Sequence, residues 1–156
     1  MNKTIIQENL PKHIAITMDG NGRWAKEKGK NRIFGHNQGI EAVRDTVEGA
    51  VEYGIKFLTL FAFSTENWNR PRHEVNALMK LLISSIHNET KTLLKNNIKL
   101  QTIGNTKQLP QQCQNELEEC IKLTKENSSM TLTLALSYSG KWEIINAINN
   151  LIKTER

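Results

Sequence analysis

The sequence predicts an α/β fold in which a mostly parallel sheet is flanked by helices. Apolar runs rich in branched and aromatic residues alternate four times with segments of helical periodicity, the order expected of parallel strands joined by crossover helices. No internal repeat or low-complexity linker divides the chain. Its 156 residues suffice to bury one core, so residues 1–156 are expected to form a single domain.

The first strands and helix follow a polar lead-in, residues 1–12. Residues 14–16 form a short apolar run with β character. Residues 40–53 carry apolar side chains at helical spacing and Gly54 follows as a stop, so this helix should cover one face of the sheet. Residues 55–63 are almost wholly apolar, which is typical of a strand covered on both faces and makes this run the best candidate for the central strand.

The second half of the chain continues the alternation. Residues 75–94 predict a long amphipathic helix whose apolar stripe packs on the core, with the alternative that part of it lines a tunnel for an apolar chain. A third strand is expected over 98–103 and a helix over 111–125. A fourth strand over 131–136 and a helix over 142–152 complete the pattern.

The charge balance favours an anionic partner, because the net charge is +5 and the isoelectric point is about 9.3. A solvated basic helix face would also explain such a run of charges. The adjoining glycines favour a localised phosphate site instead, and there is no repeated pattern of aromatic residues interleaved with basic ones, as binders of single-stranded nucleic acid tend to show. Nucleic acid is therefore not expected as a partner. The basic residues crowded after the first glycine loop are Arg23, Lys26, Lys28, Lys30 and Arg32.

Neither a membrane span nor a secretory signal is evident, because no apolar stretch is long enough and residues 1–11 lack an apolar core. A cytoplasmic location is the default expectation. Cys113 and Cys120 lie seven apart on a predicted helix, so they share a face but are too far apart for a disulfide. They are expected to pack in the core or an interface, without a metal.

The segment after the first strand has the composition of a phosphate-binding loop. Gly20 and Gly22 lack a Cβ, so the backbone N–H groups at the start of the next helix can approach a phosphate closely. Asp19 would repel that anion unless a hard cation such as Mg²⁺ lay between them, so the pattern predicts a metal diphosphate. An ordinary turn in which Asp19 is a cap remains the alternative.

Two further segments are candidates for the same site. Residues 34–39 predict a second glycine-containing loop in which His36 is either a phosphate contact or a capping or surface residue. Residues 64–71 follow the central strand, and ligands collect at the carboxyl ends of parallel strands, so this segment and the first loop should face one crevice. A helix lead-in, capped by Asn69 with Pro71 near the first helical position, leaves the polar group Glu66, Asn67 and Arg70 unexplained.

These segments resemble the signature motifs of cis-prenyltransferases (isoprenyl transferases), most closely the bacterial undecaprenyl diphosphate synthases. The matching residues are MDGNGRWA at 18–25, Arg32, Gly-His at 35–36 and FSTENWNRP at 63–71. The resemblance runs essentially from His13 to the end. It implies condensation of isopentenyl diphosphate with farnesyl diphosphate to a long-chain polyprenyl diphosphate that carries cell-wall precursors. It also implies Mg²⁺ as cofactor, a homodimer, and contact with the membrane surface through the lipid product.

The resemblance assigns roles to single residues. Asp19 matches the acidic residue that binds Mg²⁺ and promotes departure of the diphosphate, and Asn67 matches a residue commonly assigned as proton acceptor. Because an amide is a poor base, we interpret Asn67 as an orienting group, with a diphosphate oxygen or water taking the proton. The implied substrate-binding residues are Gly20, Asn21, Gly22, Arg23, Trp24, Arg32, His36, Ser64, Thr65, Glu66, Trp68 and Arg70.

The sequence also departs from the family pattern. Family members generally continue through a later segment that supplies arginines for isopentenyl diphosphate, a second carboxylate for the metal and much of the dimer contact, and none of it follows Arg156. We therefore expect a truncated domain with an exposed apolar face, which binds an allylic diphosphate but is impaired in elongation. Smaller departures lie at Asn105, Ser137, Ser139 and Lys141, where the family more often has Asp, Asn, Gly and Arg.

Two alternatives of other classes stay open. One is a non-catalytic subunit that binds polyprenyl diphosphates, and the other is a simple anion-binding or nucleic-acid-binding domain. The basic segment alone would permit the second, but it leaves residues 64–71 unexplained.

Overall fold

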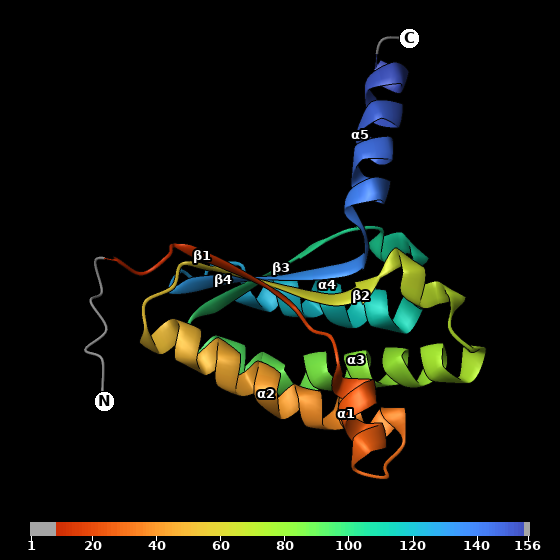
Figure 1. Ribbon diagram of the computed structural model, residues 1–156. Coiled ribbons are helices and arrows are strands. Elements are labelled where there is room, and N and C mark those ends of the chain that lie inside the picture. The colour runs from red at the N-terminus through yellow and green to blue at the C-terminus, as the bar shows by residue number, and fades with distance from the viewer. Residues whose placement is uncertain (1–8, 155–156) are drawn as a thin grey trace.

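The sheet is four-stranded and parallel throughout in the computed structural model, which describes residues 9–154 (Figure 1). The strand order is β1-β2-β4-β3, so the apolar run predicted as the central strand does lie inside the sheet. The alternation of strands and helices is as predicted. The strands are β1 (His13–Thr17), β2 (Phe57–Ser64), β3 (Ile98–Ile103) and β4 (Met130–Tyr138).

Three of the helices pack below the sheet in Figure 1, and α5 leaves the end of β4 and points away from it. Two short 3-10 helices, η2 (Thr65–Asn69) and η3 (Thr106–Gln108), follow β2 and β3. The helices below the sheet are α2 (Arg32–Glu52), α3 (Arg72–Lys95) and α4 (Gln111–Thr124), and the others are α1 (Asn21–Glu27) and α5 (Gly140–Thr154).

The loop predicted over residues 34–39 is wrong, because this segment lies inside α2. The helix begins earlier than predicted since Asn31 caps it, its Oδ1 accepting the N–H of Phe34 at 2.8 Å. The two glycines serve packing between helices. A Cβ on Gly35 would lie 2.1 Å from the backbone oxygen of Asn21, and one on Gly39 would lie 2.7 Å from the Asn21 side chain.

The prediction that β2 is covered on both faces holds only in part. Leu58 and Leu60 are buried toward the helices. On the other face, Phe57 is 49% exposed and Thr59 is hydrogen-bonded to His13 at 2.8 Å. Thr59 is nevertheless only 7% exposed, so this face is open at Phe57 and covered farther along the strand.

Both cysteines pack in the core, as predicted. Cys113 and Cys120 are free and buried on the inner face of α4. Burial raises the pKa of the Cys113 thiol to about 11, so the thiol stays protonated at neutral pH.

Helix α5 exposes a set of apolar side chains, although the sequence led us to expect exposed apolar surface at the sheet. The apolar side chains exposed on it are Ile144, Ile145, Ile148, Leu151 and Ile152. Among residues 9–154, no helix is both long and apolar enough to span a membrane.

Candidate active site

The first candidate segments meet at one edge of the sheet, as predicted. Strands β1 and β2 are parallel neighbours, with Thr17 opposite Phe61, so the residues that follow each strand leave the sheet on the same side. The end of β4 lies next to them, because β4 pairs with β2 as far as Ser64 and Tyr138.

Asp19 is exposed at the start of α1. Its Oδ1 accepts the N–H of Gly20 at 2.6 Å and its Oδ2 accepts a hydrogen bond from Arg23 at 2.8 Å. The N-cap of α1 is Gly20 rather than Asp19, with the positive φ of 94° that glycine tolerates. With the Asp19 side chain 78% exposed, the carboxylate can exchange Arg23 for another cation at little cost.

One buried carboxylate organises the positive charges of the site. Glu74, at the start of α3, is 8% exposed and accepts a hydrogen bond from Arg70 at 2.8 Å. Arg32 approaches the same carboxylate oxygen to 3.7 Å from the first turn of α2. The two arginines are thus held side by side although they come from different elements.

His36 lies beside this cluster. Its buried Nε2 has no hydrogen-bond partner among residues 9–154. Burial, and after it the nearby Arg70 guanidinium, lowers the pKa of His36 below the ordinary value, so the ring is neutral at pH 7. A buried ring nitrogen without a partner is costly unless a ligand or water completes it.

The sequence interpretation missed Glu74. The predicted helix began at residue 75, one position after it, and acidic residues are common in the first turn of a helix. The sequence offered only a weak signal, a spacing of four residues from Arg70, because Arg70 and Pro71 have extended backbone and precede the helix.

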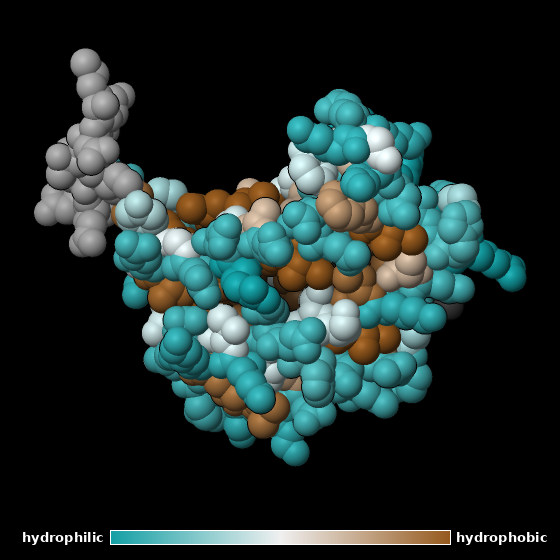
Figure 2. Space-filling view, turned by 90° about the horizontal axis from the view of Figure 1, so that it is seen from below, coloured by the Kyte–Doolittle hydropathy of each residue, from teal (hydrophilic) through white to brown (hydrophobic). Residues whose placement is uncertain are grey.

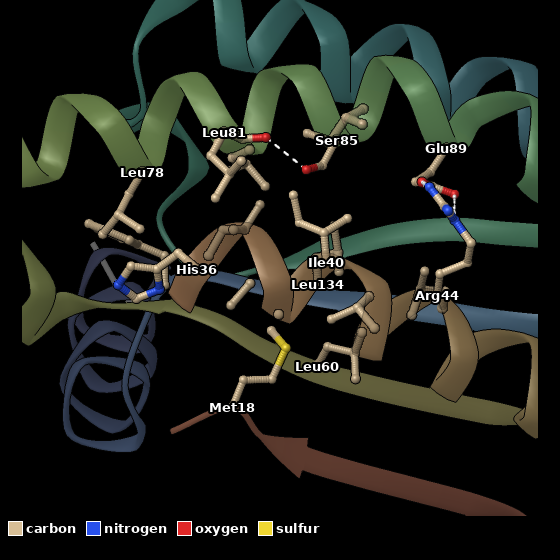
Figure 3. Close-up of a pocket in the computed structure, with 18 of the residues that line it drawn as sticks. Met18, His36, Ile40, Arg44, Leu60, Leu78, Leu81, Ser85, Glu89 and Leu134 are labelled. Atoms are coloured by element: carbon tan, nitrogen blue, oxygen red, sulfur yellow. Dashed lines mark hydrogen bonds and ion pairs between the residues drawn. The ribbon is translucent and has the colours of Figure 1, made fainter. Parts of the chain in front are cut away.

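A cavity of about 240 Å³ opens from this cluster and runs between α2, α3 and the sheet. Its polar mouth is lined by Asn21, His36, Asn67 and Arg70. Its walls are apolar, and Figure 3 shows side chains of α2, α3, β2 and β4 pointing into the space. Seen from the helix side in Figure 2, hydrophobic side chains show between polar ones over this region. Residues of the apolar stripe on α3, such as Leu78 and Leu81, therefore line a cavity as well as the core.

The predicted residues of η2 mainly fix the local backbone. Ser64 and Asn67 form a capping box in which Asn67 Oδ1 accepts the N–H of Ser64 at 3.1 Å. Thr65 donates to the Ser139 hydroxyl at 2.9 Å. The predicted cap Asn69 is wrong, because it is the last residue of η2 and Pro71 is the N-cap of α3.

The remaining predicted residues lie around the mouth rather than in it. Trp24 is 42% exposed and stacks on Phe34 with 6.2 Å between ring centroids. Glu66 is exposed, and hydrogen bonds from its own backbone and then from the Ser64 hydroxyl lower its pKa. Gly22 brings α1 against the Arg32 side chain, since a Cβ there would lie 3.3 Å from its Cγ.

Ser137 ties η2 to the end of β4. It is fully buried, accepts a hydrogen bond from Trp68 Nε1 at 2.9 Å and donates to Gln108 at 2.8 Å. Ser137→Ala should leave both partners unsatisfied and lower the free energy of unfolding by about 1–3 kcal/mol. Urea unfolding measures this. Ser84→Ala removes an exposed hydroxyl from α3 and should change stability by less than about 0.5 kcal/mol; equal losses in both variants would contradict the prediction.

Comparison with known proteins identifies the family to which this chain belongs. Residues 17–156 match the family model described as "Putative undecaprenyl diphosphate synthase". The isoprenyl transferase of Chlorobaculum tepidum is 54% identical over 142 residues, which are 91% of this chain and 54% of that protein. The farnesyl-diphosphate-specific ditrans,polycis-undecaprenyl-diphosphate synthase of Pasteurella multocida is 52% identical over 143 residues, 92% of this chain and 60% of that protein.

A solved structure shares the fold. Lavandulyl diphosphate synthase from Lavandula x intermedia, in complex with dimethylallyl diphosphate, superposes with a TM-score of 0.89 at 31% identity. The match covers 92% of this chain and 61% of that one. The chain thus spans between about half and three-fifths of the length of the relatives it matches.

Proposed function

Since this chain belongs to the undecaprenyl diphosphate synthase family of prenyltransferases, we propose that it binds an allylic diphosphate and condenses it with isopentenyl diphosphate to a polyprenyl diphosphate. The observation that carries the proposal is one cavity with largely apolar walls and a polar mouth that Arg70 lines, with Arg32 held beside it on the same Glu74 carboxylate. The diphosphate lies at the mouth and the hydrocarbon tail in the cavity. Farnesyl diphosphate is the favoured substrate, since the Pasteurella multocida relative is described as specific for it.

The chemistry demands fixed positive charge at the mouth. When an allylic diphosphate ionises, it leaves a delocalised carbocation and a highly charged pyrophosphate, so the site must stabilise the charge that develops on the leaving group. Arg32 and Arg70 supply it, held in place by the buried Glu74. Because the arginines are positioned beforehand, little reorganisation is needed as the bond breaks.

Asp19 is the residue suited to Mg²⁺. Magnesium is usually bound through one or two carboxylates, with water and substrate phosphates completing its octahedron. Asp19 is an exposed carboxylate that lies in the sequence between Met18 and Asn21, two residues that line the cavity. When bound there, the ion would neutralise charge on the departing diphosphate.

Asn67 acts as a positioning residue in this proposal. Its Oδ1 is engaged by the Ser64 N–H, which leaves Nδ2 to donate toward a ligand in the cavity. A donor cannot take the proton that condensation releases, so a diphosphate oxygen or water accepts it. Assembly as a homodimer, a cytoplasmic location and delivery of the lipid product at the membrane surface complete the proposal.

The full chain, farnesyl diphosphate, labelled isopentenyl diphosphate and Mg²⁺ provide the test. Elongated lipid supports the proposal. Binding of farnesyl diphosphate without elongation supports a non-catalytic subunit that binds polyprenyl diphosphates. Absence of both leaves only the anion-binding or nucleic-acid-binding alternative and overturns the proposal.

Asp19→Asn should remove the effect of the metal on binding. Titration calorimetry of farnesyl diphosphate with and without Mg²⁺ should show tighter binding with the metal in the unaltered chain, by about tenfold or more, and no such gain in the variant. Asp45→Asn changes an exposed carboxylate on α2 and should keep the gain. A variant at position 19 that still responds fully to Mg²⁺ would rule out this role.

A further inference from the structure

One ion pair bridges the two helices that wall the cavity, at a distance from its mouth. Arg44 of α2 donates through Nε to both carboxylate oxygens of Glu89 on α3, at 3.1 and 3.2 Å, and through Nη2 to Oε1. Both residues line the cavity. Figure 3 shows the pair spanning the space between α2 and α3, with His36 at the opposite end of the view.

The position of the pair relates to the length of the cavity. His36 and Arg44 are eight positions apart on α2, which is about 12 Å along the helix axis. Between them the lining side chains are mostly apolar, such as Ile40 and Leu81. The one hydroxyl labelled in this stretch of Figure 3, that of Ser85, donates to the backbone oxygen of Leu81 at 2.8 Å. One turn past the pair, the cavity is lined by Val47 and Leu93, which are 5% and 6% exposed and close its end.

The Arg44–Glu89 pair is also partly exposed to solvent on the side away from the cavity. The Arg44 side chain is 47% exposed and the Glu89 side chain 22% exposed. Solvent therefore lies directly behind the pair. An apolar chain too long for the cavity would leave between α2 and α3 at this point.

We propose that the Arg44–Glu89 pair is a gate that limits the length of the tail the cavity accepts. This inference rests on the proposed function, since it places the substrate tail in the same cavity. A tail that passes between the helices must break several charge-assisted hydrogen bonds and bring hydrocarbon against two charges. Shorter tails meet only apolar walls and gain affinity with each buried methylene.

Binding of saturated alkyl diphosphates of increasing length to the full chain tests the gate. These probes share the diphosphate head but lack the allylic double bond, so binding is measured without reaction. In the unaltered chain each added methylene should tighten binding by up to about fourfold, until a length at which affinity stops rising and falls. In Arg44→Ala this break should move to longer tails. Those longer tails should bind the variant at least about tenfold more tightly than they bind the unaltered chain, and the affinity for short tails should not change.

Further variants distinguish a pair that limits tail length from a strut, by which we mean an ion pair that only stabilises the packing of α2 on α3. Glu89→Gln keeps the size of the side chain but removes its charge, and it should also shift the break. The double variant Arg44→Glu with Glu89→Arg exchanges the two residues and keeps an ion pair. It should therefore show the break at the same tail length as the unaltered chain. As a control, Glu116→Gln removes the carboxylate that lies 3.5 Å from His87 and joins α3 to α4 outside the cavity, and it should leave the break unchanged.

The outcomes are distinct. If Arg44→Ala and Glu89→Gln lower the urea midpoint but keep the break at the same tail length, the pair is a strut and the gate is overturned while the proposed function stands. If no alkyl diphosphate of any length binds the unaltered chain, the proposed function fails and the gate fails with it.

Discussion

Gly35→Ala is expected to lower the free energy of unfolding by about 1–3 kcal/mol or more, because the new methyl group has no room. Its Cβ would lie 2.1 Å from the backbone oxygen of Asn21 and 2.9 Å from the Cβ of Ala25, so α1 must move away from α2. Asn21 lines the mouth of the cavity, and the affinity for farnesyl diphosphate should fall with the stability. Urea unfolding and titration calorimetry measure the two effects.

Gly49→Ala is the matched control for this substitution. Gly49 lies in the same helix, and a Cβ there would meet no atom within 4 Å. Alanine is favoured over glycine inside a helix by about 0.5–1 kcal/mol, so this variant should be as stable as the unaltered chain or more stable. If Gly35→Ala were equally well tolerated, the close packing of α1 on α2 would not hold the mouth in place.

Removal of both site arginines should have the largest effect on binding. Each charge-assisted hydrogen bond contributes about 1.5–3 kcal/mol, so Arg32→Ala with Arg70→Ala should weaken the binding of farnesyl diphosphate by about a hundredfold or more. Glu74, left without partners, adds repulsion of the diphosphate. The salt dependence of the dissociation constant should also flatten, because fewer cations face the ligand.

Two further variants exclude trivial explanations for that loss. Arg72→Ala removes an equal charge from an exposed position two residues from Arg70, and it should change affinity little. Adding Glu74→Gln to the double arginine variant removes the unpaired buried carboxylate, so stability should recover while binding stays weak. Recovery of binding together with stability would mean that the arginines act on the fold and not on the ligand.

The part of the site prediction that depended on chain topology concerned which segments lie together. Asp19 follows one parallel strand and residues 64–71 follow its neighbour, so the sheet brings both to one edge. The prediction was less reliable where it depended on reading a glycine. Gly35 and Gly39 suggested a loop, but they lie inside α2 against Asn21. A glycine that is needed for the backbone conformation of a turn cannot be distinguished, in a sequence, from a glycine that allows a neighbouring helix to pack closely.

Local periodicity and residue type therefore determined the order of strands and helices, the parallel sheet and the motifs that mark the family. These depend on neighbours a few residues apart, which a sequence displays directly. Only the tertiary structure decided that Glu74 holds Arg32 and Arg70 together, and that the apolar stripe of α3 faces a cavity whose lining also includes the ion pair between Arg44 and Glu89. Such features depend on distances between helices, because a buried charge needs a partner from another element and an apolar side chain packs equally well on a core or around a lipid tail.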